Sequence, residues 1–270
     1  MTKTVTSTMT TVNVLSTYTP IPGPALDMLV IGDWGTDVDD QFNVAKQMER
    51  WASALQSDKV ISLGDNFYQG DATYDGIATA NDVKFITYWK NVYNGTYLST
   101  LKWWTVLGNH DWYSVGSDAY ELMFNDDKWV MPDFFYIKRK QVDDGVFATF
   151  IFIETDLFEY GVQAKNKGMQ QNFASQGWDQ NTNLKQLAWI ENAIAQSNKD
   201  QYIIVVGHHP TYTCAGDVTD DLGSLYNIIN TWNVSAYMNG HSHSMAGYLT
   251  NNNRTLQVQA GSGGQTSSTC

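Results

Sequence analysis

Gly64-Asp65-Asn66-Phe67-Tyr68 directly follows the apolar run Val60-Ile61-Ser62-Leu63, and this order of residues is the starting point for the fold. A strand that ends in Gly-Asp delivers a carboxylate to the loop at its carboxyl end, and a Tyr three residues later can reach the same point in space. A carboxylate can bridge two hard cations, and a phenolate is a strong ligand for a trivalent metal such as Fe(III). The pair indicates a metal site, although an ordinary turn with a half-buried Tyr68 would use the same residues.

The same order, an apolar run and then Gly beside polar side chains, recurs along the chain. The other runs and their loops are Met28-Leu29-Val30-Ile31 with Gly32-Asp33-Trp34-Gly35, 102–107 with Gly108-Asn109-His110-Asp111, Tyr202 to Val206 with Gly207-His208-His209-Pro210, and Val234 to Met238 with Asn239-Gly240-His241-Ser242-His243. Helical patterns separate several runs, and this alternation predicts an α/β fold with parallel strands. In open α/β sheets, ligands bind at the carboxyl ends of the strands. The loops with polar side chains are therefore expected to meet there.

The remaining pattern predicts the elements between these strands. We expect helices over 38–56, 81–93, 182–194 and 222–231, the first capped by Asp37 and the third by Thr182. The residues expected on the buried face are Val38, Phe42, Ala45, Met48, Trp51, Ala52 and Leu55 in the first helix, and Val83, Ile86, Trp89 and Tyr93 in the second. The other expected features are a covered strand over 146–153, an edge strand or hairpin over 131–136, and a solvated turn at Lys138-Arg139-Lys140.

Composition limits the class of protein. With 270 residues, of which 43% are hydrophobic and 13% aromatic, the chain fits one large globular domain or two small ones. We expect residues 1–24 to form a loose Thr/Pro-rich leader and residues 25–270 to form the domain, which would be truncated at its C-terminus. The formal net charge of -12 argues against nucleic acid as a partner, because phosphate backbones favour basic patches. No run of about 18 apolar residues occurs, so no membrane span is expected.

Cysteines and glycosylation sequons say little about the chemistry. Two cysteines occur, Cys214 and Cys270, which excludes a disulfide framework and a zinc finger but leaves a single bridge open. The N-terminus lacks the apolar core of a signal peptide. Three sequons, which begin at Asn94, Asn233 and Asn253, slightly favour a secreted glycoprotein.

All five histidines lie in three of the loops that follow predicted strands. Histidines used as core or surface filler would also occur on helices, so this distribution indicates ligands. In His241-Ser242-His243, residues two apart in an extended loop point the same way and can bind neighbouring cations. The candidate metal donors are Asp33, Asp65, Tyr68, Asn109, His208, His241 and His243. Mononuclear zinc needs only three or four donors, so the set favours two metals that share one carboxylate.

Together, the motifs Gly-Asp, Gly-Asp, Gly-Asn-His-Asp, Gly-His and Gly-His-x-His resemble those of the calcineurin-like metallophosphoesterase superfamily. They span residues 32 to 243. Gly32-Asp33-Trp34-Gly35 and the stretch from Gly64 to Tyr68 are similar to the purple acid phosphatases, specifically their small tartrate-resistant, mammalian-type branch, and Tyr68 is the discriminating residue. The resemblance implies a four-layer α/β/β/α sandwich of mixed sheets, with the metal site at the carboxyl edges of the strands.

The resemblance also implies the roles of the site residues. In it, Fe(III) would be held by Asp33, Tyr68 and His243. A divalent Fe, Zn or Mn would be held by Asn109, His208 and His241, and Asp65 would bridge the two ions. His110 would face the substrate and bind phosphate or protonate the leaving oxygen. Relatives often carry a further substrate-facing His near the position of Asp217, and His209 could partly replace it. The implied catalytic residues are His110, Asp65 and His209.

These roles imply an acid phosphatase that hydrolyses phosphate monoesters by attack of metal-bound hydroxide at an Fe(III)-M(II) centre. Its partners would be small phosphorylated substrates or phosphoproteins, and we expect a monomer that is secreted or lysosomal/vacuolar. Two alternatives stay open. One is a phosphodiesterase or nucleotide hydrolase with the same dinuclear site, and the other is a non-catalytic iron-binding or redox relative, which would have no need of His110.

Overall fold

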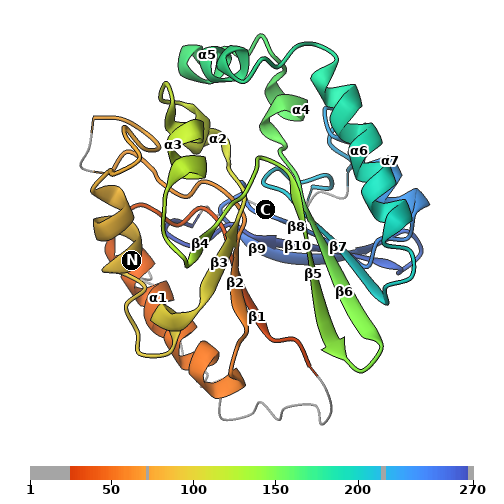
Figure 1. Cartoon of the computed structure of the whole chain (residues 1–270), viewed down its shortest axis with the longest axis horizontal. Helices are drawn as coiled ribbons and strands as arrows, with labels where there is room; N and C mark the ends of the chain where they lie inside the picture. Colours follow the sequence, from red (N-terminus) through yellow and green to blue (C-terminus); the bar gives the residue numbers. More distant parts are fainter. Residues whose placement is uncertain (1–24, 71–72, 214–216, 267–270) are drawn as a thin grey trace, which may run out of the picture.

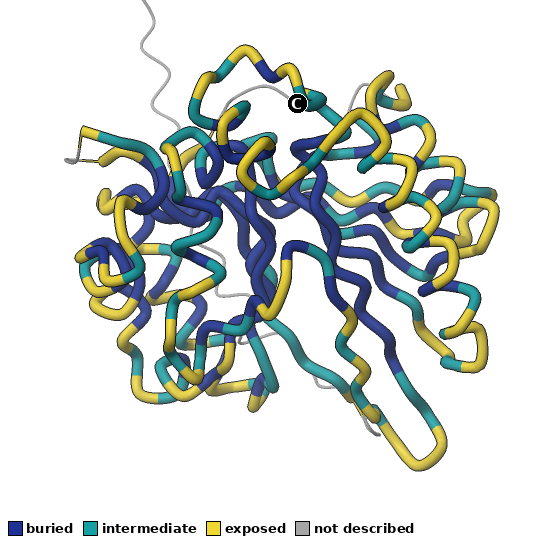
Figure 2. Tube along the Cα trace, turned by 45° about the horizontal axis from the view of Figure 1, so that its top comes forward, coloured by how far each residue is buried: buried dark blue, intermediate teal, exposed yellow. Residues whose placement is uncertain are grey.

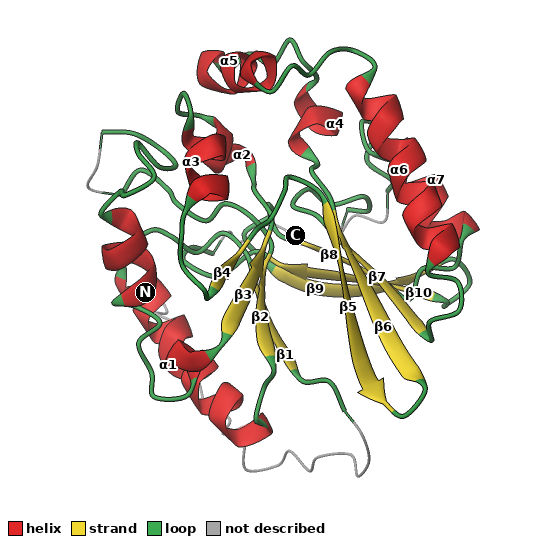
Figure 3. Ribbon diagram, viewed as in Figure 1, coloured by secondary structure: helices red, strands yellow, loops and turns green. Residues whose placement is uncertain are grey.

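The computed structural model describes residues 25–70, 73–213 and 217–266. Two β-sheets lie next to each other, with helix α1 (Asp39–Leu55) outside the first sheet and helices α6 (Thr182–Gln196) and α7 (Gly223–Thr231) outside the second (Figure 1, Figure 3). This is the four-layer α/β/β/α sandwich predicted from the sequence. The predicted leader and both cysteines, Cys214 and Cys270, fall outside the described residues. Among the helices of the described part, none has the length and apolarity to span a bilayer.

The first sheet is parallel throughout and has the order β1-β2-β3-β4. Its strands are β1 (Met28–Ile31), β2 (Lys59–Ser62), β3 (Lys102–Thr105) and the short β4 (Trp129–Val130). Val30 pairs with Ile61, and Ile61 pairs with Trp104. Because parallel strands end on the same side, the loops after β1, β2 and β3 lie at one edge, as the repeated strand-then-Gly pattern predicts.

The second sheet is mixed and has the order β5-β6-β7-β8-β10-β9. Its strands are β5 (Tyr136–Asp143), β6 (Val146–Phe152), β7 (Tyr202–Val206), β8 (Ala236–Asn239), β9 (Met245–Thr250) and β10 (Thr255–Ala260). Strands β6, β7, β8 and β10 run parallel, and the antiparallel strands β5 and β9 form the edges. A backbone hydrogen bond of 2.7 Å from Gly32 N to Ala260 O joins the two sheets at their carboxyl ends.

Shorter helices lie in the connections between strands. They are a π-helical turn (Phe85–Lys90), a 3-10 turn (Leu98–Thr100), α2 (Asn109–Trp112), α3 (Ser117–Met123), α4 (Asp156–Tyr160) and α5 (Lys167–Ser175). Three residues separate β3 from α2, and three separate β6 from α4, so both helices lie at the edge where the strands end (Figure 1).

Apolar side chains fill the space on both faces of the second sheet. Between the sheets, the Trp104 ring centroid lies 5.5 Å from that of Phe150 and 6.0 Å from that of Phe152. On the opposite face, Ile151 belongs to a buried cluster with Ile190 of α6. Successive side chains of a strand point to opposite faces, so β6, covered on both sides, is a nearly continuous apolar run, interrupted only by Thr149, as predicted. The strands form the buried centre of the molecule and the outer helix faces are exposed (Figure 2).

The predicted helix over 38–56 is present as α1, but its predicted cap is wrong. Val38 occupies the cap position and no side chain caps this helix, whereas Gln41 Oε1 accepts the backbone N–H groups of Thr36 and Asp37 in the turn before it. Gln41 is fully buried and its Nε2 donates to Tyr88 O at 2.7 Å, whereas Phe42 is 36% exposed. A glutamine whose amide is fully hydrogen-bonded can occupy a buried position, which hydropathy alone does not reveal.

The predicted helix over 81–93 is a shorter π-helical turn, and two of its predicted inward residues are wrong. Asn91 N donates to Ile86 O, five residues back. This wider turn shifts the buried face, so Val83 is 62% exposed and Ile86 is 44% exposed. The residues buried in this segment are Phe85, Tyr88, Trp89, Val92 and Tyr93.

Strand β5 begins at Tyr136, so most of the edge strand predicted over 131–136 is absent. Lys138-Arg139-Lys140, predicted as a solvated turn, lies within β5. Two of these cations have acidic partners on the sheet surface: Arg139 Nη2 lies 2.7 Å from an oxygen of Asp200, and Lys140 Nζ lies 2.7 Å from an oxygen of Asp58. The ion pairs explain why a basic cluster stays on a strand.

Helix α6 begins at the residue that was predicted to cap it. Thr182 is the first helical residue, and Asn181 occupies the cap position. The Thr182 hydroxyl accepts the backbone N–H of Asp179 at 2.9 Å, which closes the turn before the helix. The predicted cap of the helix is therefore wrong by one residue.

Candidate metal centre

The seven predicted donors come together where the carboxyl ends of the two sheets meet. Their positions are Asp33 after β1, Asp65 and Tyr68 after β2, Asn109 at the start of α2, His208 after β7, and His241 and His243 after β8. Five separate loops thus contribute to one place. The distances between their ligand atoms divide them into two groups.

The first group is centred on the hydroxyl of Tyr68. This oxygen lies 3.1 Å from Asp33 Oδ1, 2.9 Å from Asp65 Oδ2 and 3.0 Å from His243 Nε2. One hydroxyl donates only one hydrogen bond, so at most one carboxylate can receive its proton. Four electron-pair donors this close together suit a cation, and phenol, carboxylate and imidazole are ligands that transition metals accept.

The second group is centred on Asn109 Oδ1. This oxygen lies 3.3 Å from His208 Nε2 and 3.0 Å from His241 Nδ1, and His208 Nε2 lies 3.5 Å from Asp65 Oδ1. The other nitrogen of His208, Nδ1, lies 2.8 Å from Leu63 O. A carbonyl only accepts hydrogen bonds, so Nδ1 carries a proton, and in the neutral ring Nε2 has the lone pair that a cation can take.

Asp65 lies between the two groups. Its Oδ2 faces Tyr68 of the first group and its Oδ1 faces His208 of the second. The ligand atoms of Asp33, Asp65 and His208 lie within 4.8 Å of one another, as do those of His208, His209 and His241. The residues present therefore fit two cations that share the Asp65 carboxylate.

The site concentrates buried negative charge. Asp33 is fully buried and Asp65 is 2% exposed, and among the described residues neither forms an ion pair with Lys or Arg. Burial raises the pKa of Asp33, and burial together with the Asp65 and Asp33 carboxylates raises the pKa of Tyr68. Burial alone would also raise the pKa of Asp65, but His208 outweighs it and lowers that pKa. Cations between these groups would stabilise the ionised forms.

Three of the seven residues have a left-handed backbone conformation. Their φ angles are 59° for Asp33, 50° for Asp65 and 66° for His241. For a residue other than glycine this conformation costs roughly 1–2 kcal/mol. The backbone N–H of Asp33 donates to Gly64 O at 3.0 Å and that of His241 donates to Asp33 Oδ2 at 2.9 Å, which holds the conformation. Strain at three donor positions is typical of a functional site.

Two glycines of the strand-then-Gly pattern lie directly against the carboxylates. A Cβ at Gly108 would lie 2.5 Å from Asp65 Oδ1, and a Cβ at Gly240 would lie 2.5 Å from Asp33 Oδ2. Even a methyl group would have to displace a carboxylate oxygen. Close approach of the backbone thus explains why glycine occurs at these positions.

We expect Gly108→Ala to lower metal affinity by about 10- to 100-fold, because the new methyl group would displace the Asp65 carboxylate. The measurement is a metal titration of the purified variant. Gly223→Ala is the matched control, since a Cβ at Gly223 would meet no atom within 4 Å. Equal affinity in the Gly108→Ala variant and the unaltered protein would contradict the expectation.

His110 lies beside the first group but is not one of its donors. Its ring centroid is 4.3 Å from that of Tyr68, and its Nδ1 is 2.9 Å from Asp75 Oδ1. Burial alone would lower the pKa of His110, but the hydrogen bond to Asp75 and the charge of Asp65 outweigh burial and raise that pKa. The side chain is 28% exposed, so one edge of the ring can meet a bound molecule.

His209 is buried behind the second group. Its Nδ1 lies 3.0 Å from Thr155 Oγ1 and its Nε2 lies 3.4 Å from the Tyr160 hydroxyl, and burial lowers its pKa. Its catalytic role stays a prediction. Asp217 is exposed, and its backbone N–H donates to the Thr213 hydroxyl at 3.2 Å.

Three residues contact the site although the sequence analysis named them neither as donors nor as catalytic residues. They are Tyr113 beside Asn109, Thr155 beside His208 and His209, and Asp75 beside His110. Tyr113 stands four residues after Asn109, and residues at this spacing share a helix face, so a predicted helix there would have revealed it. No sequence signal marks Thr155 or Asp75, because their contacts depend on how separate loops meet.

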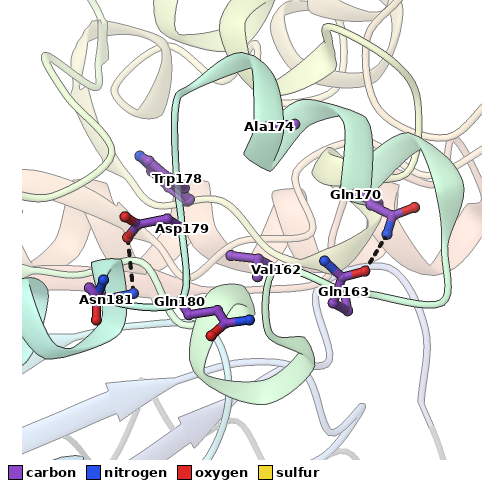
Figure 4. A pocket seen from close by; sticks show the side chains of 8 residues that line it. All are labelled: Val162, Gln163, Gln170, Ala174, Trp178, Asp179, Gln180 and Asn181. Carbon is purple, nitrogen blue, oxygen red and sulfur yellow. Dashed lines mark hydrogen bonds between the residues drawn. The ribbon is translucent and has the colours of Figure 1, made fainter.

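A hollow of about 590 Å³ lies beside α4 and α5 and contains none of the seven donors (Figure 4). Its lining residues are Val162, Gln163, Gln170, Ala174, Trp178, Asp179, Gln180 and Asn181. Gln170 Nε2 donates to Gln163 Oε1 at 3.1 Å on one side of the hollow (Figure 4). Since no Lys, Arg or His lines it, the hollow is poorly suited to phosphate, and the donor cluster is the candidate site.

Comparison with known proteins indicates the same chemistry. Residues 26–245, which include all seven donors, match the family model described as calcineurin-like phosphoesterase. Tartrate-resistant acid phosphatase type 5 of Mus musculus is 27% identical over 263 residues, which cover 92% of this chain and 76% of that protein. Purple acid phosphatase 7 of Arabidopsis thaliana is 29% identical over 252 residues, which cover 88% and 70%. Among solved structures, GAP50, described as the anchor in the inner membrane complex of Plasmodium, matches with a TM-score of 0.68 and 25% identity over 88% of this chain and 72% of that chain.

Proposed function

Because the chain belongs to the calcineurin-like phosphoesterase family, we propose that it is an acid phosphatase that hydrolyses phosphate monoesters at a dinuclear metal centre. The observation that carries the proposal is the position of Asp65, which has one carboxylate oxygen at each of the two donor groups. Similarity to tartrate-resistant and purple acid phosphatases supports the choice of monoesters.

The two donor groups differ in the metals they would hold. The first group, whose donors are Asp33, Tyr68 and His243, includes a phenol and suits Fe(III). The second group suits divalent Fe, Zn or Mn, and the two groups share Asp65. The donors of the second group are Asn109, His208 and His241. When bound, the two cations would polarise the phosphate ester and lower the pKa of water.

His110 is the residue that we propose acts on the substrate. Its Nε2 has no hydrogen-bond partner among the described residues, and its side chain is 28% exposed. The backbone N–H of His110 donates to Asp65 Oδ1 at 2.8 Å, so the ring keeps a fixed position relative to the bridging carboxylate. Phosphate binding or proton donation by such a residue contributes about 10²- to 10⁴-fold to turnover.

The test measures hydrolysis and metal content on the same purified protein. We expect about two metals per chain and faster turnover of p-nitrophenyl phosphate than of bis(p-nitrophenyl) phosphate at acidic pH. Removal of the metals with a chelator should abolish hydrolysis, and their return should restore it. Preference for the diester would instead favour a phosphodiesterase or nucleotide hydrolase.

A non-catalytic relative is the second candidate function. It is favoured by the similarity to GAP50, which is described as an anchor rather than as an enzyme. An anchor needs neither a metal centre nor a substrate-facing His110, so bound metals together with hydrolysis would exclude this candidate. Bound metals without hydrolysis of either ester would support it.

The proposed partners are small phosphorylated substrates or phosphoproteins, acted on by a monomer. The net charge of -12 disfavours nucleic acid as a partner. The sequon residues Asn94, Asn233 and Asn253 are exposed, as N-glycosylation of a secreted or lysosomal protein requires. A shift in electrophoretic mobility after glycosidase treatment of the protein from its native source would test that location.

A further inference from the structure

Asp75 and His110 form a hydrogen-bonded pair beside the proposed metal centre. His110 Nδ1 lies 2.9 Å from Asp75 Oδ1, which also accepts the backbone N–H of Gln69 at 3.0 Å. The two side chains are 28% and 26% exposed, so the pair is partly accessible to solvent. A carboxylate only accepts hydrogen bonds, so Nδ1 of His110 carries the proton and the ring presents Nε2 on its other side.

A buried lysine fixes the loop that carries Asp75. Lys84 is 1% exposed, and its Nζ donates to the backbone carbonyls of Tyr68, Tyr74 and Gly76, each at 2.8 Å. These bonds use all three donors of the ammonium group. They connect the proposed metal donor Tyr68 to both neighbours of Asp75, so one loop determines the positions of both side chains.

The imidazole of His110 is held from other directions as well. Its backbone N–H donates to Asp65 Oδ1 at 2.8 Å, and its ring centroid lies 4.3 Å from that of Tyr68 and 4.8 Å from that of Tyr113. With Asp75 on Nδ1, the ring atom that stays available for a hydrogen bond is Nε2, which has no partner within the part of the chain that the structure describes. The ring is therefore held in place, and Nε2 is the ring nitrogen left for a bound molecule.

We propose that Asp75 is a positioning residue that holds His110 with Nε2 toward the leaving oxygen, and that the preferred substrates are alkyl phosphate monoesters. The proposal rests on the acid phosphatase function proposed above. A water oxygen bonds to phosphorus while the bond between phosphorus and the ester oxygen breaks. His110 acts in its imidazolium form, with a proton on each ring nitrogen. The proton on Nε2 goes to that ester oxygen, the attacking water releases one proton to solvent, solvent then reprotonates Nε2, and Asp75 keeps its hydrogen bond to Nδ1 throughout.

The substrate class follows from the leaving group. An alkoxide leaves poorly unless it is protonated as the bond breaks, whereas a nitrophenolate leaves well without a proton. A proton donor held in a fixed orientation therefore assists alkyl esters most, such as those of serine or of a sugar. A disturbed donor should slow the alkyl esters far more than the nitrophenyl ester.

The experiment compares Asp75→Asn with the unaltered protein on glycerol 2-phosphate and on p-nitrophenyl phosphate. We expect kcat for the glycerol ester to fall by about 10²-fold, with KM and metal content unchanged and with nearly unaltered turnover of the nitrophenyl ester. In a His110→Ala background, Asp75→Asn should have no further effect, because a residue that acts through His110 has nothing left to position.

Tyr74→Phe is the matched control, because it removes a hydroxyl that donates to Asp82 on the same loop without touching His110. This variant should hydrolyse both esters normally. Equal losses on the two esters, loss of bound metal in Asp75→Asn, or additive effects of Asp75→Asn and His110→Ala would overturn the positioning role. An unaltered protein that holds two metals and hydrolyses neither ester would instead refute the acid phosphatase function, and this inference with it.

Discussion

Replacing Asp65 with asparagine is expected to remove most of the bound metal and to lower phosphate monoester hydrolysis by about 10³-fold or more. Asp65 Oδ2 lies 2.9 Å from the Tyr68 hydroxyl and Oδ1 lies 3.5 Å from His208 Nε2, so one carboxylate serves both donor groups. An asparagine has a single oxygen, and its NH₂ group would point two hydrogens at one of the cations. It also lacks the negative charge that a bridging ligand supplies. Metal content and kcat on the same sample measure the effect.

Asp118→Asn is the control for this variant. Asp118 of α3 is also a buried carboxylate, 1% exposed, and lies outside both donor groups, where it accepts a hydrogen bond of 2.8 Å from Gln176 Nε2 at the end of α5. Equal loss of metal in both variants would indicate a general effect on folding. Two bound metals and full turnover in Asp65→Asn would show that Asp65 does not bridge the cations.

The sequence could predict the donor set because fold and chemistry use the same residues. In the parallel first sheet, the residue after each strand necessarily lies at the shared edge, so Asp33, Asp65 and Asn109 could be brought together from their order alone. A glycine beside a donor also indicates the site in the sequence, because Gly108 and Gly240 touch carboxylate oxygens that a Cβ would displace. The repeated strand-then-Gly pattern therefore predicted both the topology of the sheet and the location of the site.

Features that depend on contacts between distant segments could not be predicted in this way. Strand β10 has alternating polar residues, and Gln257 and Gln259 are buried because side chains from other segments, Thr211 and Ser244, hydrogen-bond them. No apolar run marks such a strand. The pairing of Asp75 with His110 is similar, since it depends on a loop that a buried lysine holds in place. Single-residue hydropathy contains no information about either arrangement.

Replacing Tyr68 with phenylalanine is expected to abolish a visible absorption band while bound metal is largely retained. A phenolate bound to Fe(III) gives a ligand-to-metal charge-transfer transition, and phenylalanine has no oxygen to bind. Burial and two carboxylates raise the pKa of Tyr68, so the hydroxyl ionises only when a cation takes the place of its proton. The colour would therefore report iron at the first group. The measurement is a spectrum after mild oxidation, with metals assayed on the same sample.

Tyr113→Phe is the matched control for the loss of colour. The Tyr113 hydroxyl lies 2.8 Å from Asn109 Nδ2, beside the second group, so its removal should not affect the band. A band that persists in Tyr68→Phe would exclude Tyr68 as the iron ligand. An unaltered protein with two metals and no band would place a metal other than Fe(III) at the first group and leave the hydrolytic proposal standing. The reason is that carboxylate and imidazole ligands also bind divalent cations, so colour tests the identity of the metal whereas turnover tests the dinuclear centre.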